Sequence, residues 1–252
     1  PGCREYGGGG GGVAVGFGFN APYGLGMEWP DGWAGFEDVE AIDLQTFLLN
    51  PTLAWSPVEW FSFAAGFDAV RSIVSLRKGI QLFDERGTLE GGAGAWGFGG
   101  NVGALVRILD GRLSFGVSYR SAVKLEFSGS ADFTVPDSFA SALEDQPLES
   151  TILLPHTIAV GIAGIPHEMV TLDLDLLITT WSTFDEFGFR FPEDEGKPED
   201  ERLTQFERRD WSDAASLRVG VEVRPGVEGL ALRAGFVFDR SPSPRDTMSP
   251  SL

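Results

Sequence analysis

The stretch Arg112–Gly129, RLSFGVSYRSAVKLEFSG, alternates apolar with small or polar residues for longer than any other part of the chain. Successive side chains of a β-strand point to opposite faces, so the pattern predicts one strand with an apolar and a polar face. Strands of soluble sandwiches keep such alternation for about five or six residues, roughly a third of this length. About ten tilted residues suffice to cross a bilayer, so this strand could span a membrane.

The polar face of this stretch carries charged side chains, Arg120, Lys124 and Glu126. Such residues fit a wet barrel lumen better than the dry core of a sandwich. The stretch therefore predicts an all-β fold, an antiparallel transmembrane β-barrel with apolar residues outside and polar residues inside.

The composition is compatible with one large all-β domain. The 252 residues include 34 glycines and carry a net charge of −18, which argues against nucleic acid as a partner. There is no run of 18 apolar residues, so a helical membrane span is not expected. One cysteine, Cys3, and two histidines, His156 and His167, give no basis for a metal site, and no cofactor is expected. Residues 1–12 are glycine-rich and resemble a leader or truncation scar, leaving 13–252 as a single, incomplete barrel domain.

Alternation or turn chemistry marks roughly nine strands. They are Val13–Ala21, Asp43–Trp55, Trp60–Leu76, Gly94–Ile108, the opening stretch, Thr151–Gly164, Glu168–Thr180, Asp213–Arg224 and Leu230–Asp239. In the seventh, Asp173 and Asp175 fall on the polar, inward face. Short turns at one end and long loops at the other are typical of bacterial outer-membrane barrels.

Three of the loops have a predicted character of their own. A loop is expected from Lys78 to about Gly92, and a long polar loop over Trp181–Ser212. The segment Asp137–Asp145 follows a proline and spaces Phe139 and Leu143 four apart, which predicts a short helix in an extracellular loop.

Six short motifs resemble one known family. In chain order they are NAPYGL (Asn20–Leu25), SFAAGFDAV (Ser62–Val70), WGFGGNVG (Trp96–Gly103), VSYRSAVK (Val117–Lys124), TWSTF (Thr180–Phe184) and FDRSPSP (Phe238–Pro244). The chain thereby resembles the FadL-type long-chain fatty acid transporters of Gram-negative outer membranes, which include relatives that import aromatic hydrocarbons. The resemblance implies a barrel of about fourteen strands, plugged by an N-terminal hatch and releasing ligands through a lateral opening.

The resemblance is incomplete in two respects. The hatch and first strands that would precede Val13 are absent, and so are the last strands after Leu252, which suggests an internal fragment of the family's chain. The loop after Lys78 is also shorter than the helical hairpin that serves family members as an outer docking groove.

The resemblance also implies ligand-binding residues. Lys78, with Arg77 beside it, falls where the family places a basic residue facing the ligand carboxylate, and Arg208 or Arg209 lies near a second basic position. A carboxylate in an apolar pocket needs such partners. The alternative for Lys78 is an interfacial cation near lipid headgroups.

A second implied feature is a lateral gate. Asn20, Pro22, Tyr23 and Gly24 match the strand whose kink opens the barrel wall in the family, although an ordinary strand end at a proline is the alternative. For the lumen-lining residues Arg120, Lys124, Glu126, Asp173 and Asp175, a structural ladder of charges is favoured over a specific transport role.

These features predict a passive outer-membrane channel, not an enzyme, for hydrophobic compounds, with long-chain fatty acids favoured. The expected surroundings are outer-membrane lipid and lipopolysaccharide, and the expected state is a monomer. The alternatives are a channel for neutral aromatic hydrocarbons of the toluene or xylene type, a lipase-like barrel, and a soluble β-sandwich binding module. A lipase would need an inward Ser/His pair, which the sequence does not offer. Gly92–Gly97 fits the G-x-G-x-x-G pattern of dinucleotide-binding loops, but it begins a strand and no helix follows, so a dinucleotide site is not expected.

Overall fold

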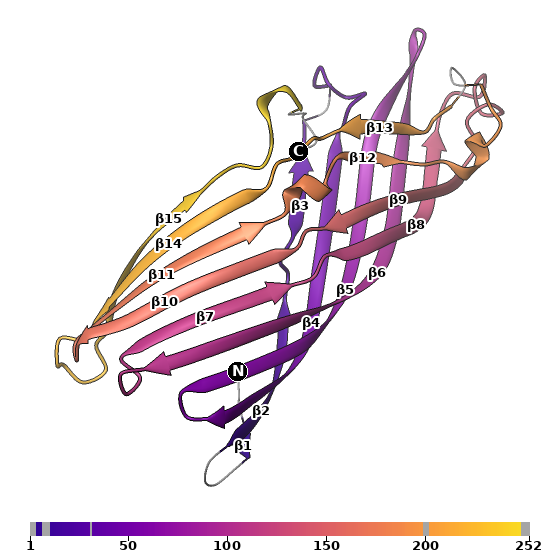
Figure 1. The fold of residues 1–252 in the computed structure, drawn as a ribbon. Helices are drawn as coiled ribbons and strands as arrows, with labels where there is room; N and C mark the ends of the chain where they lie inside the picture. Colours follow the sequence, from indigo (N-terminus) through magenta and orange to yellow (C-terminus); the bar gives the residue numbers. More distant parts are fainter. Residues whose placement is uncertain (1–3, 7–10, 31, 199–201, 248–252) are drawn as a thin grey trace.

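Antiparallel strands form nearly all of the regular structure in the computed structural model, which describes residues 4–6, 11–30, 32–198 and 202–247. Figure 1 shows long, tilted strands that curve side by side into an open trough. The strands are β1 (Arg4–Tyr6), β2 (Gly12–Asn20), β3 (Gly24–Glu28), β4 (Ala41–Val58), β5 (Phe61–Leu82), β6 (Glu85–Ile108), β7 (Leu113–Arg120), β8 (Val123–Thr134), β9 (Gln146–Leu154), β10 (Thr157–His167), β11 (Val170–Thr179), β12 (Glu186–Phe189), β13 (Gln205–Arg208), β14 (Ala214–Val223) and β15 (Leu232–Asp239). The predicted all-β, antiparallel fold is confirmed.

One sheet of 13 strands makes the wall, in the order β1-β2-β4-β5-β6-β7-β10-β11-β14-β15. Three strands lie off this path, because β3 pairs with β4, and β8 and β9 pair with each other while β8 also pairs with β6. Each predicted strand is found, but two are interrupted, the opening stretch at residues 121–122 and Thr151–Gly164 at residues 155–156, and a third break at residues 21–23 separates β2 from β3. Of the predicted leader, residues 1–3 and 7–10 lie outside the described part of the chain.

The break after Arg120 reverses which face of the strand looks inward. In β7, Phe115 and Val117 are exposed on the outer surface, whereas in β8 Leu125 and Phe127 are 1% exposed and belong to the interior apolar cluster. Ser121 and Ala122 therefore shift the alternation by one residue.

The same reversal moves two predicted lumen residues. Lys124 and Glu126 alternate with the buried residues of β8, so they lie on the outer face, where Lys124 Nζ is 2.6 Å from Glu126 Oε1. The prediction that these two side chains line the interior is corrected. Arg120 precedes the break and keeps its inward position.

Close approach to β6 is what allows β8 to lean inward. A Cβ atom on Gly97 would lie 2.5 Å from Val123 Cγ1 and 2.6 Å from the Lys124 carbonyl oxygen. A Cβ atom on Gly99 would lie 2.7 Å from Ser121 Oγ. Glycine at these two positions lets the start of β8 pack on the inner face of β6.

The predicted helix at Asp137–Asp145 is wrong. The segment forms consecutive turns, in which the amides of Ala142 and Leu143 both donate to the Phe139 carbonyl. Isolated helices this short are marginal, and two acids at the C-terminal end oppose the helix dipole. Asp145 instead accepts a hydrogen bond from the Phe133 amide, at 2.8 Å. The helical elements described are short 3₁₀ turns, η1 (Trp181–Thr183), η2 (Pro192–Asp194) and η4 (Arg245–Thr247).

The loop predicted after Lys78 is also wrong. Strands β5 and β6 continue as a ladder from Phe61↔Val106 to Leu82↔Glu85 and turn at Phe83, which has a φ of 55°. At 22 and 24 residues, both strands are about twice as long as a membrane crossing requires. The hairpin therefore extends well beyond the bilayer.

The outer surface divides into an apolar belt and a polar upper part. The belt includes Phe17, Phe19, Leu53, Trp55, Phe63, Phe67, Phe98, Val117, Val160, Leu174, Val219 and Phe236, all exposed. Above it, the outward residues Ser75, Glu90, Ser130 and Asp132 are polar. Such a belt is what a barrel presents to lipid. In the part of the chain that the structure describes, no helix is long and apolar enough to cross a membrane.

Candidate functional site

An apolar cavity of about 400 Å³ lies inside the upper part of the trough. Two basic residues, Lys78 and Arg209, and three acidic residues, Glu37, Asp38 and Glu207, contribute to its wall. The apolar lining comprises Ile42, Leu76, Ile80, Leu89, Phe133, Leu143, Leu148, Phe187, Phe189, Phe191 and Leu203. Small-molecule sites are typically apolar cavities of this size with a few polar groups, so this is the candidate site.

Part of this lining comes from the segment predicted to be a long polar loop. Residues 186–189 and 205–208 pair as the two-stranded sheet β12–β13. This sheet is fixed to β9, because Glu149 and Arg190 exchange backbone hydrogen bonds of 2.9 and 2.8 Å and Ser150 Oγ donates to the Gly188 carbonyl. The alternating Phe187, Phe189 and Phe191 are the signal that sequence reasoning missed.

Lys78 and Arg77 occupy opposite faces of β5. Lys78 follows Leu76 on the inner face and lines the cavity. Within the described residues, no carboxylate oxygen lies within 4.0 Å of its Nζ. Arg77 instead forms ion pairs with Glu28 and Glu40, at 3.6 and 3.5 Å. Lys78 thus keeps its charge available to a bound ligand, whereas Arg77 does not face the cavity.

Arg209 and Arg208 are separated in the same way. Arg209 is 1% exposed in the cavity wall, and its Nη2 is 2.6 Å from Glu207 Oε2. Burial lowers the pKa of the Arg209 guanidinium below its ordinary value, and Glu207 opposes this effect. The Arg208 side chain is 81% exposed and pairs with Asp210. Of the four basic residues predicted, the structure brings Lys78 and Arg209 to one cavity and leaves Arg77 and Arg208 outside.

Asp194 holds together the loop that carries Arg209. Its Oδ2 accepts hydrogen bonds from the amides of Leu203 and Thr204 and from Thr204 Oγ1, at 2.9, 2.7 and 2.7 Å. Burial alone would raise the pKa of Asp194, but the Thr204 hydrogen bonds and Lys197 outweigh it, so the pKa lies below its ordinary value of 3.8. The carboxylate therefore stabilises the loop in its ionised form.

We expect this loop to loosen in acid. Because the folded-state pKa of Asp194 is lowered, its contribution is fully present above the unfolded-state value and is lost as pH falls through the folded-state value, below 3.8. Pepsin cleavage within residues 181–212, followed from about pH 5 to about pH 2, measures the effect. Asp194→Asn should raise cleavage across this range and flatten its pH dependence. Equal profiles for the two proteins would contradict the role of Asp194.

The predicted gate coincides with a real break in the wall. Strand β2 ends at Asn20, β3 begins at Gly24, and Pro22 and Tyr23 lie between them. The Tyr23 ring meets Trp181 edge to face with centroids 5.9 Å apart, so a side chain from the break packs against η1. A role in lateral release stays a prediction.

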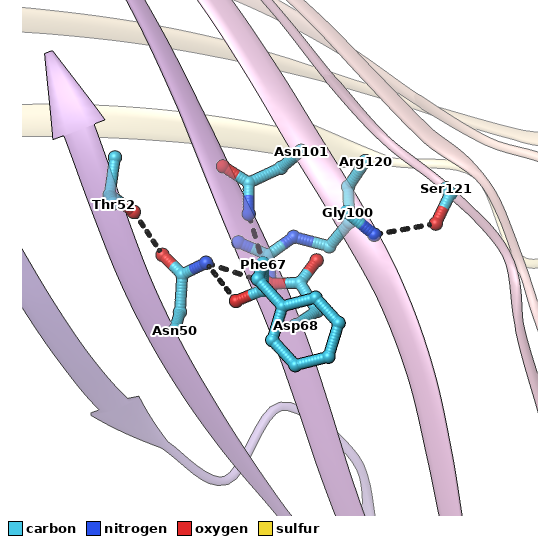
Figure 2. A network of polar contacts seen from close by, with 8 residues as sticks. All are labelled: Asn50, Thr52, Phe67, Asp68, Gly100, Asn101, Arg120 and Ser121. Carbon is cyan, nitrogen blue, oxygen red and sulfur yellow. Dashed lines mark hydrogen bonds and ion pairs between the residues drawn. The ribbon is translucent and has the colours of Figure 1, made fainter.

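A buried polar network lies further down the interior (Figure 2). Asp68 of β5 is 0% exposed, and its Oδ1 accepts hydrogen bonds from Asn50 Nδ2, Asn101 Nδ2 and Arg120 Nη1 at 2.8, 2.9 and 3.2 Å. Asp173 and Asp175 lie on the inner face of β11, opposite the exposed Leu172 and Leu174.

Comparisons with known proteins agree with this architecture. Residues 10–252 match the family model described as outer membrane protein transport protein (OMPP1/FadL/TodX). The chain is 27% identical over 259 residues to the long-chain fatty acid transport protein of Salmonella typhi, covering 91% of this chain and 57% of that protein. The corresponding protein of Escherichia coli strain K12 is 25% identical over 272 residues, covering 91% and 58%. The chain thus spans less than two thirds of the length of these relatives.

Solved structures show the same fold. A FadL homologue from Pseudomonas aeruginosa superposes with a TM-score of 0.81 at 15% identity, covering 96% of this chain and 62% of that one. The toluene transporter TodX of P. putida gives a TM-score of 0.59 at 14% identity, covering 91% and 63%. The family description is one of transport, which confirms that the chain is not an enzyme. The chain therefore belongs to the OMPP1/FadL/TodX family of transport proteins, β-barrels of the Gram-negative outer membrane.

Proposed function

We propose that this chain forms the ligand-binding wall of a channel that takes up hydrophobic compounds passively, with long-chain fatty acids as the substrate. The observation that carries the proposal is the presence of Lys78 and Arg209 in one apolar cavity. An alkyl chain gains free energy by leaving water for such a lining, at about 0.8 kcal/mol per buried CH₂. A carboxylate entering the same cavity must be paired, because an unpaired buried charge is costly.

The two basic residues have different parts in this proposal. Lys78 has no ion-pair partner among the described residues and would take the carboxylate first. Arg209 is already bound to Glu207, so it contributes positive potential and a rigid donor in the wall. The tail would lie against Phe187, Phe189 and Phe191 on the β12–β13 side.

Release is proposed to occur sideways at the break formed by Asn20, Pro22, Tyr23 and Gly24. There β4 loses its partner between Asn20, which pairs with Leu48, and Gly24, which pairs with Gln45. We further propose a monomeric protein whose barrel domain covers residues 13–252 and is surrounded by outer-membrane lipid and lipopolysaccharide.

A neutral aromatic hydrocarbon is the second candidate substrate. Four phenylalanines line the cavity, Phe133, Phe187, Phe189 and Phe191, and ring contacts with an aromatic ligand would suit them. For such a ligand the basic residues would be dispensable.

Growth on oleate separates the two candidates. In a host that lacks its own outer-membrane fatty acid channel, the full protein should restore growth, and Lys78→Ala should reduce oleate uptake about tenfold or more because one charged hydrogen bond is lost. Arg208→Ala is the matched control and should have no effect, since this side chain points away from the cavity. An inserted protein that does not restore growth would move the assignment to the neutral hydrocarbon.

A further inference from the structure

We propose that Arg120 forms a second carboxylate-binding site, deeper in the interior than Lys78. When no ligand is bound, the carboxylate of Asp68 pairs with Arg120 in the position that a ligand carboxylate would share. The inference rests on the proposed function and adds a second ligand-binding site to the proposed uptake path. For Arg120, the sequence alone favoured a purely structural role in a ladder of charges.

Asp68 is the fixed half of this pair. Its Oδ1 accepts hydrogen bonds from Asn50 and Asn101 as well as from Arg120, so two amide donors remain on that oxygen if Arg120 leaves (Figure 2). Its Oδ2 is buried and has no hydrogen-bond partner within the described residues. The carboxylate is therefore anchored by β4 and β6 independently of the arginine.

Arg120 is the member of the pair that can bind Asp68 and a ligand carboxylate at the same time. Its side chain is 35% exposed, and its one ion pair within the described residues is the 3.2 Å contact with Asp68. A guanidinium has five N–H donors, and a ligand carboxylate can take two of them in parallel. Among the described residues, Asp68 is thus the one acceptor for Arg120, and most of its donors are unused there.

The surroundings of Arg120 supply further donors and an apolar wall. Thr157 is the cross-strand partner of Arg120 in the β7–β10 ladder, and its side chain interacts with the Tyr23 side chain. Tyr23 and Trp181 pack against the interior apolar cluster that includes Val70 and Leu125. A carboxylate at Arg120 would therefore have a hydroxyl beside it and apolar side chains for the attached chain.

Three breaks in the wall converge on this level. Arg120 is the last residue of β7, and the amide of Ser121, in the break, donates to the Gly100 carbonyl of β6. Tyr23 lies in the break between β2 and β3, and Thr157 begins β10 directly after the third break. A ligand held at Arg120 would thus lie beside the proposed lateral exit, where the strand ladder is interrupted.

Distance makes this a separate site from the upper cavity. Lys78 and Asp68 lie on the inner face of the same strand, ten residues apart, which is about 33 Å along β5. This separation exceeds the extended length of oleic acid. An oleate molecule whose carboxylate contacts Lys78 therefore cannot also contact Arg120 with that carboxylate. A ligand would occupy the two sites in sequence.

Asp68→Asn gives the most distinctive test, because it is expected to improve binding. The amide oxygen can keep the contacts of Oδ1, and the amide nitrogen takes the place of Oδ2, which has no partner. Arg120 then loses its competing internal charge. In a Lys78→Ala background, Asp68→Asn should bind oleate about tenfold more tightly and Arg120→Gln about tenfold more weakly.

Calorimetric titration of the full, detergent-purified protein with oleate measures both effects, and oleyl alcohol is the uncharged control whose affinity should stay the same. Arg120→Lys keeps the charge and should retain oleate binding, which serves if Arg120→Gln does not fold. Weaker oleate binding by Asp68→Asn, or equal shifts for oleate and oleyl alcohol, would overturn the second site. Comparing wild type with Lys78→Ala alone tests the upper cavity separately, so the failure of one site is distinguishable from the failure of the other.

Discussion

Gly129→Ala is expected to prevent β8 from pairing with the upper half of β6, with a loss of stability of about 3 kcal/mol or more. A Cβ atom at residue 129 would collide with the Gly92 carbonyl oxygen and lie 2.6 Å from Ala93 Cα. These are backbone atoms of the ladder partner, so no side-chain rotation can relieve the clash. The ladder from Gly94↔Ser128 to Thr88↔Thr134 would have to separate.

Gly92→Ala is the matched control for this substitution. It lies on the partner strand at the neighbouring ladder position, and no heavy atom of the described residues, its two chain neighbours aside, lies within 4 Å of its added Cβ. Urea unfolding of the two variants in detergent, with the shift of the heat-dependent gel band as a second readout, compares them directly. Similar stability for both variants would contradict the close crossing of β8 and β6.

Lys78→Glu is expected to abolish oleate binding in the upper cavity, with an affinity loss of about a hundredfold or more. The substitution removes a charged hydrogen bond and adds a repulsive carboxylate to a cavity that already contains Glu37, Asp38 and Glu207. Toluene carries no charge, so its binding should change little.

The matched control for the charge reversal is Arg77→Glu. It makes the same change of charge one residue away, on the opposite face of β5. Equilibrium titration with a fluorescent fatty acid analogue measures both variants. Equal losses for Lys78→Glu and Arg77→Glu would show that the effect comes from net charge and not from the cavity.

Local alternation predicted the strands, whereas the position of Lys78 facing a ligand came only from the family resemblance. Because side chains alternate strictly along an unbroken strand, the even positions from Asp68 to Lys78 share the interior face of β5. The same rule assigns Arg77 to the other face. The prediction nevertheless placed Arg77 and Lys78 together at one ligand-binding site.

The break at Ser121 and Ala122 could not be predicted in this way. Neither residue is glycine or proline, and the apolar residues keep their spacing straight through the break. What holds the break is tertiary: the Ala122 amide donates to His156 Nδ1, and Ser121 bonds to Gly100. Pro155 before His156 is a local signal for the neighbouring break, since proline removes a ladder donor.

The cavity itself depends on contacts between distant segments. Arg209 and Lys78 line the same cavity because the β12–β13 sheet is bound to β9, through pairing of Glu149 with Arg190 that no local pattern predicts. The alternating phenylalanines of that segment indicated a strand but not which face of the barrel it would cover.

The most direct test of the central claim is the difference in affinity between oleate and oleyl alcohol for the wild-type protein, repeated with Lys78→Ala and with Arg208→Ala. The account predicts that wild type and Arg208→Ala prefer oleate by about tenfold or more, and that Lys78→Ala loses most of this preference. Equal affinity of wild type for the two ligands would contradict carboxylate recognition in this cavity.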